Sequence, residues 1–108
     1  MLSIVLATYN EEKNIEKCLG TASIRNIVDE IIVVDGSSID KTRDLSEKLG
    51  ARVIKTTNKA NFHINKQMAM DEAKGDIVLQ LDADSISVLY QKSSKNSYLL
   101  LKKFSQNS

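Results

Sequence analysis

Two aspartates, Asp82 and Asp84, directly follow the apolar run IVLQL with a single alanine between them. A carboxylate is costly to bury, so a strand that ends in such a pair has either reached solvent or directs the pair toward a cation. Carboxylate oxygens at positions i and i+2 of an extended chain emerge close together, and Mg²⁺ and Mn²⁺ prefer oxygen ligands. A divalent cation held there would neutralise the charge that develops on a leaving diphosphate.

Polar side chains also follow the other strand-like runs. Thr8 and Tyr9 come after the first apolar run, and Asp35 ends the second. Asp35, at the end of a buried strand, suits hydrogen bonds from a base N–H or a ribose hydroxyl, and the Tyr9 ring offers a surface on which a flat base can stack. Lys66, near the start of a predicted helix, offers a positive charge for phosphate.

The elements that must position these residues alternate along the chain. Continuous apolar runs predict buried strands, and capping residues followed by apolar residues at helical spacing predict helices between them. The predicted strands are residues 3–7, 30–35, 52–55 and 77–82, and the predicted helices begin after Asn10, at Ser38 and near Ile64. This alternation predicts an α/β fold with a parallel sheet and helices on both faces. Ligands bind at the carboxyl ends of the strands in such sheets, which is where the polar residues gather.

Length and composition narrow the class of protein. A chain of 108 residues predicts one domain, and a net charge of +1 gives no reason to expect nucleic acid as a partner. Cys18 is the only cysteine, which excludes a disulfide within the chain and favours a cytoplasmic setting. No stretch approaches the ~20 apolar residues of a membrane span.

The end of the chain differs in composition from the rest. Residues 1–84 carry eleven basic and fourteen acidic residues, a net charge of −3, whereas residues 85–108 carry four lysines and no acid. We therefore divide the chain into residues 1–87 and an atypical lysine- and serine-rich tail, 88–108. The tail is expected to be a poorly ordered end or a cover over the exposed sheet, with a basic amphipathic helix on a membrane surface as the alternative.

Three stretches, SIVLATYNEEKNIEKCL, DEIIVVDGSSIDKT and AKGDIVLQLDADS, resemble in that order and spacing the N-terminal half of the family-2 glycosyltransferases. The nearest branch is that of bacterial lipopolysaccharide-core and other cell-envelope enzymes. The resemblance covers about residues 2–87 and implies the Rossmann-like GT-A fold, incomplete at its C-terminal side, with strand order 3-2-1-4. It also implies metal-dependent transfer of a sugar from a nucleotide-diphospho-sugar donor to a hydroxyl of a glycan or lipid-linked acceptor.

The nucleotide-sugar site that the resemblance implies falls on residues from several parts of the chain. Thr8, Tyr9 and Glu11 would lie about the base. Asp35 would hold the base or the ribose. Lys66 stands where the family often has an arginine near the diphosphate.

The metal site that the resemblance implies falls on the paired aspartates. Asp82 and Asp84 match the family's Asp-x-Asp motif, with Asp84 as a direct ligand of Mn²⁺ or Mg²⁺ and Asp82 shared between the ribose and the metal. The chain departs from the family pattern at Ile39, where a threonine is usual. The family's catalytic base lies in its second half, so no catalytic residue is assigned, and the chain is expected to be a truncated or frame-disrupted copy.

Two other functions remain open from the sequence. The chain could hold a nucleotide sugar without transferring it. A haloacid-dehalogenase-type phosphatase also ends a strand in Asp-x-Asp, with its first Asp as the nucleophile, but that motif normally follows the first strand. The expected surroundings are the cytoplasm or the inner face of the membrane, with peripheral membrane contact and a second copy covering the sheet as further possibilities.

Overall fold

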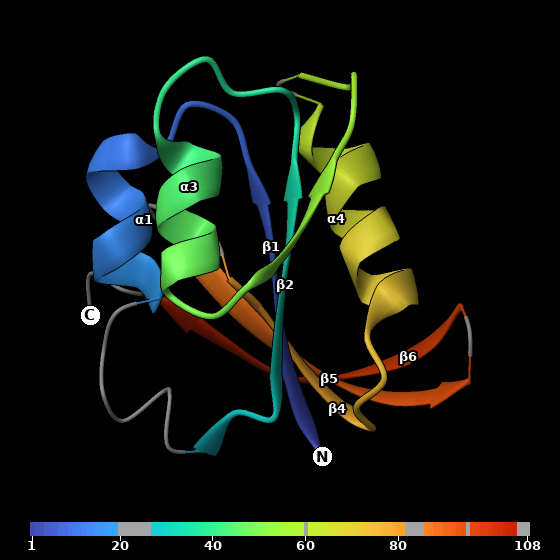
Figure 1. The fold of residues 1–108 in the computed structure, drawn as a ribbon. Coiled ribbons are helices and arrows are strands. Elements are labelled where there is room, and N and C mark those ends of the chain that lie inside the picture. The colour runs from blue at the N-terminus through green and yellow to red at the C-terminus, as the bar shows by residue number, and fades with distance from the viewer. Residues whose placement is uncertain (20–26, 60, 82–85, 95, 106–108) are drawn as a thin grey trace.

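The computed structural model describes residues 1–19, 27–59, 61–81, 86–94 and 96–105 (Figure 1). Its sheet has six strands in the order β3-β2-β1-β4-β5-β6. The elements in chain order are β1 (Leu2–Thr8), α1 (Glu12–Leu19), β2 (Glu30–Asp35), α3 (Thr42–Lys48), β3 (Arg52–Lys55), α4 (Phe62–Glu72), β4 (Ile77–Leu81), β5 (Ile86–Ser94) and β6 (Ser97–Ser105).

The first four strands form the predicted parallel sheet. β1 pairs in parallel with β2 on one side and with β4 on the other, and β3 continues the sheet beyond β2. The predicted order 3-2-1-4 is confirmed, and each strand lies within a residue or two of its predicted bounds.

Helices cover both faces of this sheet because the middles of its central strands, residues 4–7 and 31–34, are apolar at every position and buried. Alternate residues of a strand point to opposite faces, so neighbouring residues of β1 enter different cores. Ile4 packs with Ile15 of α1 and Leu45 of α3, whereas Val5 packs with Ala69 of α4. Figure 1 shows α1 and α3 on one side of the sheet and α4 on the other.

The second helix starts later than its sequence predicted. Ser38 was expected to cap it, but α3 begins at Thr42. The reason is tertiary: the backbone N–H and the hydroxyl of Ser38 both donate to Asp35, at 2.8 and 2.6 Å. Ser38 therefore closes the turn after β2 instead of capping the helix.

The tail is not helical in the part that the structure describes. β5 pairs antiparallel with β4, and β6 pairs antiparallel with β5, so the tail extends the sheet by a hairpin. The alternative of an amphipathic helix is wrong, and the boundary that we placed after Ser87 falls inside β5. No described helix is both long and apolar enough to cross a membrane.

Contacts with α4 hold the hairpin in place. The ammonium of Lys92 donates to the carbonyl oxygens of Met70 and Ala73, at 2.8 and 2.7 Å, and so caps the C-terminal end of α4. The Tyr98 hydroxyl donates to the Asp71 carboxylate at 2.8 Å. These contacts join residues far apart in sequence, which explains why local patterns did not predict the hairpin.

Candidate functional site

The centre of the candidate site lies where β1 and β2 end side by side. Thr8 and Asp35 are register partners, and both side chains are fully buried. The Thr8 hydroxyl donates to Asp35 Oδ1 at 2.6 Å. The carboxyl ends of the two strands are therefore joined by a side-chain bond as well as by the sheet.

The Asp35 carboxylate accepts four hydrogen bonds. Oδ1 accepts from the hydroxyls of Thr8 and Ser38, and Oδ2 accepts from the Ser38 N–H and from the Arg43 guanidinium, at 2.8 and 3.1 Å. An ionised carboxylate has about four lone-pair positions, so this buried group is fully satisfied by the protein. The charge of Asp35 is balanced by Arg43, whose side chain is 30% exposed.

The loop after β1 is locked to the turn after β2 by reciprocal bonds. The Asn10 N–H donates to the Ser38 hydroxyl at 2.8 Å, and the Ile39 N–H donates to the Asn10 side-chain oxygen at 2.9 Å. One residue further, the Glu11 N–H donates to the Thr42 hydroxyl at 2.8 Å. The two loops therefore form a single unit around the site.

A second acid, the partly exposed Asp40, supports the same unit. Asp40 accepts hydrogen bonds from the Thr42 hydroxyl and from the N–H groups of Thr42 and Glu12. Partial burial acts to raise the pKa of Asp40, but these hydrogen bonds together keep that pKa below its ordinary value. Asp40 therefore stays ionised beside the first residue of α1, where the helix dipole favours a negative charge.

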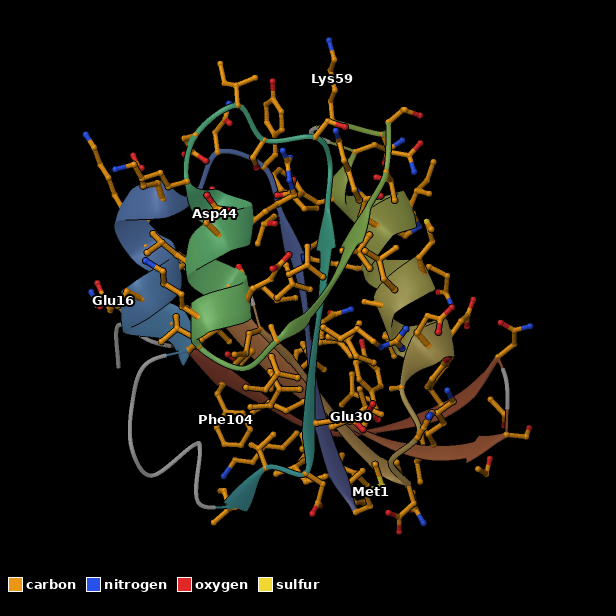
Figure 2. The ribbon with its side chains drawn as sticks, viewed as in Figure 1. Met1, Glu16, Glu30, Asp44, Lys59 and Phe104 are labelled. Carbon is orange, nitrogen blue, oxygen red and sulfur yellow. The ribbon has the colours of Figure 1, made fainter. Side chains whose placement is uncertain are left out.

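The loop between β3 and α4 presses against the same turn. The Thr56 N–H donates to the Asp35 carbonyl oxygen at 2.7 Å, and the Ser37 hydroxyl donates to the Thr56 carbonyl oxygen at 2.5 Å. A Cβ at Gly36 would lie 2.0 Å from the carbonyl oxygen of Lys59, so only glycine fits at this position. Figure 2 shows Lys59 at the end of the molecule opposite Met1, which marks the edge where the site lies.

The structure brings together several of the predicted nucleotide-binding residues. Thr8 and Asp35 are bonded to each other, Tyr9 follows Thr8 directly and is half-buried, and Glu11 lies in the locked loop after β1. The Glu11 carboxylate accepts from the Asn14 side chain at 3.1 Å. These positions agree with a site at the strand ends, and the ligand contacts assigned to them stay predictions.

Lys66 lies on α4 in a different setting. It lines a pocket of about 380 Å³ between α4 and strands β4, β5 and β6. The other lining residues are His63, Gln67, Met70, Gln80, Tyr90 and Tyr98. The side chain of Lys66 is half-buried there, and its predicted contact with a diphosphate stays a prediction.

The paired aspartates, Asp82 and Asp84, fall outside the described residues. β4 ends at Leu81, which pairs with Leu6 of β1, so the chain leaves β4 at the same edge of the sheet as the Thr8–Asp35 pair. Among the residues that are described, no three His, Cys, Asp or Glu side chains are grouped to hold a metal ion. The two aspartates nevertheless offer the hard oxygen ligands that Mg²⁺ and Mn²⁺ prefer.

The sequence did not predict the roles of two residues that bond to Asp35. Arg43, which balances Asp35, was not singled out, and Ser38 was given only a capping role. A signal was present: Arg43 is the only arginine in the segment after Asp35 up to Gly50, and it lies within the predicted helix. Its pairing with Asp35 could be recognised only once the turn was folded.

The chain is similar to known proteins over most of its length. The model of the family described as "Glycosyl transferase family 2" matches residues 3–87. An uncharacterized glycosyltransferase of Rickettsia bellii is 39% identical over 83 residues, which cover 77% of this chain and 27% of that protein. A dolichol-phosphate mannosyltransferase of Pyrococcus furiosus is 32% identical over 89 residues, 77% of this chain and 25% of that protein.

The fold is also similar to that of a solved structure. Glucosyl-3-phosphoglycerate synthase of Mycobacterium tuberculosis, crystallised with Mn²⁺, UDP and glucosyl-3-phosphoglycerate, superposes with a TM-score of 0.66 at 29% identity. The match covers 79% of this chain and 34% of that protein. The chain spans about a quarter of the length of the curated relatives that it matches.

Proposed function

The chain belongs to glycosyl transferase family 2, and we propose that its strand-end site binds a nucleotide-diphospho-sugar whose sugar is transferred to an acceptor hydroxyl. The observation that carries this proposal is the unit built around Asp35, in which three loops converge at the carboxyl ends of β1, β2 and β3. This is the edge where α/β sheets bind ligands. The M. tuberculosis synthase, which shares the fold, was solved with UDP and Mn²⁺.

Within this site, we assign Thr8, Tyr9 and Glu11 to the surroundings of the base, with the Tyr9 ring as the stacking surface. Asp35 holds the loops in place and is assigned to the base or the ribose. A direct bond from Asp35 to the ligand requires one of its present donors to give way, and Arg43 is the partly exposed one. Binding therefore exchanges a protein contact for a ligand contact at this carboxylate.

The metal of the proposed reaction is Mn²⁺ or Mg²⁺, which Asp84 would bind directly, while Asp82 would be shared between the ribose and the metal. Its chemistry is to neutralise the charge that builds on the departing nucleotide diphosphate. The residues of the chain supply the carboxylate oxygens for that ion, and Lys66 supplies a further positive charge toward the diphosphate. The support for this assignment comes from the sequence: the pair directly follows β4, whose last residue, Leu81, pairs with Leu6 of β1.

The acceptor is proposed to be a glycan or a lipid-linked molecule of the cell envelope, modified at the cytoplasmic side of the membrane. The P. furiosus relative, which is named for dolichol phosphate, supports a lipid-linked acceptor. The phosphatase alternative has no support, because the Asp-x-Asp pair follows the fourth strand and the family match covers the whole region around it.

The test is a titration of the 108-residue chain with UDP and with GDP, each with and without Mn²⁺. We expect one of the two nucleotides to bind in an Mn²⁺-dependent manner, and Asp84→Asn to remove that dependence. The matched control is Asp44→Asn, on the exposed face of α3, which should leave binding unchanged. Equal affinity of wild type and Asp84→Asn in the presence of Mn²⁺ would rule out the metal assignment.

A turnover assay separates the enzyme from the second candidate, a domain that holds the nucleotide sugar without transferring it. The chain is incubated with Mn²⁺, sugar nucleotides and acceptors, and the released nucleotide diphosphate is measured. Release above that of the Asp84→Asn variant supports transfer by this chain. Binding without release identifies a donor-binding module.

A further inference from the structure

The last strand of the sheet carries an unusual number of exposed apolar side chains. β6 stands at the end of the strand order, and no described strand pairs with its outer edge. Leu99, Leu100, Leu101 and Phe104 are 62%, 47%, 44% and 40% exposed. Single exposed apolar residues are ordinary, but a cluster on one strand marks an interaction surface.

These side chains lie on both faces of the edge strand. Leu100 pairs in register with Tyr90, which packs toward α4, whereas Leu99 pairs with Gln91 on the opposite face. The register between β5 and β6 shifts at Leu101, because Tyr90 pairs with Leu100 but its neighbour Leu89 pairs with Lys102. Phe104 lies on the face that carries α1 and α3 (Figure 2). The apolar surface therefore wraps around the rim of the sheet.

Positive charge lies directly beside this apolar rim. Lys102 and Lys103 are exposed, and the Lys102 ammonium lies 5.1 Å from the centre of the Phe104 ring. No acidic residue occurs in the sequence after Asp84, so no carboxylate of this hairpin neutralises these lysines. We call Leu99, Leu100, Leu101, Lys102, Lys103 and Phe104 the β6 rim.

We propose that the β6 rim docks on the surface of a lipid bilayer that contains anionic phospholipids. Apolar side chains flanked by lysines match such a surface, because the former enter the headgroup boundary while the latter contact lipid phosphates. The rim is also prepared for docking, since Lys92 and Tyr98 hold the hairpin against α4. Docking therefore requires little ordering of the chain.

Two other partners fit the β6 rim less well. A second copy pairing edge to edge through β6 would bring Lys102 and Lys103 of both copies to one seam, and β6 has no acidic residue to neutralise them. A nucleic acid would satisfy the lysines but would leave the leucines exposed to water. A bilayer satisfies both kinds of side chain.

The test measures co-sedimentation of the chain with vesicles of phosphatidylcholine alone and of phosphatidylcholine mixed with phosphatidylglycerol. We expect binding to the anionic vesicles that weakens as salt is added. Lys102→Gln with Lys103→Gln should weaken it about 30-fold, since each surface lysine contributes roughly fivefold. The matched control, Lys13→Gln with Lys17→Gln on the exposed face of α1, removes the same charge and should change binding little.

A fluorescence measurement tests the apolar part separately. The chain has no tryptophan, so Leu99→Trp introduces a single reporter on the β6 rim and Ile39→Trp places one on an exposed site elsewhere. We expect the emission of Trp at position 99, and not at position 39, to shift to shorter wavelength on anionic vesicles. The circular dichroism of each variant confirms that it is folded.

Three results would overturn the proposal. The first is no binding to either kind of vesicle. The second is an equal loss of binding in the α1 control pair, which would indicate attraction by net charge alone. The third is a dimer in lipid-free sedimentation that the β6 lysine or Leu99 variants abolish or strengthen, which would make the rim an interface between copies. Because no rim residue belongs to the nucleotide site, failure here leaves the proposed function standing.

Discussion

The Arg43 guanidinium lies 3.1 Å from a carboxylate oxygen of Asp35, and the two residues occupy opposite ends of the turn that joins β2 to α3. The same guanidinium donates to the Ser38 carbonyl oxygen at 2.8 Å. Arg43 thus closes the turn by bridging a side chain and the backbone. The pair couples the charge of a buried site residue to the first turn of a helix.

Asp35→Asn is expected to destabilise the chain by about 3 kcal/mol. The amide keeps one acceptor oxygen, but its NH₂ group replaces the other oxygen and faces hydrogen-bond donors of the protein. The charge of Arg43 also loses its partner. Denaturant unfolding followed by circular dichroism measures the change. Asp44→Asn, an exposed acid on the same helix, should stay within about 0.5 kcal/mol of wild type. Equal stability of the two variants would contradict the central role of Asp35.

Gly36→Ala is expected to disturb the site through the backbone. The new Cβ would lie 2.0 Å from the Lys59 carbonyl oxygen, so the β3–α4 loop must move, at a cost of about 3 kcal/mol. Gly50→Ala is the matched control: it meets no atom within 4 Å, but its φ of +92° is unfavourable, at about 1–2 kcal/mol. A smaller loss of stability at position 36 than at position 50 would show that the loop yields easily.

The sequence predicted the parallel part of the fold because its signals are local. Residues 4–7 and 31–34 are apolar at every position, as expected of strands buried on both faces. Thr8 and Asp35 lie side by side because the parallel strands β1 and β2 both end there. The start of α3 was missed because Ser38 bonds to Asp35 across the turn, which no local pattern records.

The hairpin could not be predicted for a related reason. An apolar run as short as 99–101 fits a helix or a strand equally well, and its choice depends on its neighbours. Here residues 99–101 belong to β6, which pairs with β5, and Lys92 and Tyr98 of this hairpin bond to the end of α4. Compositional reasoning identified the charge of this segment but could not identify the strand to which it pairs.

Lys92→Met should loosen the attachment of the hairpin to α4. The variant keeps the length of the side chain but removes the ammonium that donates to the carbonyls of Met70 and Ala73. We expect a loss of about 2 kcal/mol, since charged hydrogen bonds to a helix end disappear. Lys74→Met, at an exposed position beside the same helix end, should cost less than about 0.5 kcal/mol. Thermal unfolding of both variants provides the comparison, and an equal loss would contradict the capping role.

Tyr98 should give the fold a distinct sensitivity to alkaline pH. Burial, together with the hydrogen bond to the Asp71 carboxylate, raises the pKa of Tyr98 to about 12. The unfolded chain releases this proton near pH 10, whereas the folded chain retains it until about pH 12. The stability that Tyr98 contributes is therefore fully present below pH 10 and falls between pH 10 and 12. Ultraviolet titration of tyrosinate should show a late-ionising component that Tyr98→Phe removes and that Asp71→Asn shifts to lower pH. An unchanged titration in Tyr98→Phe would show that this hydroxyl does not carry the raised pKa.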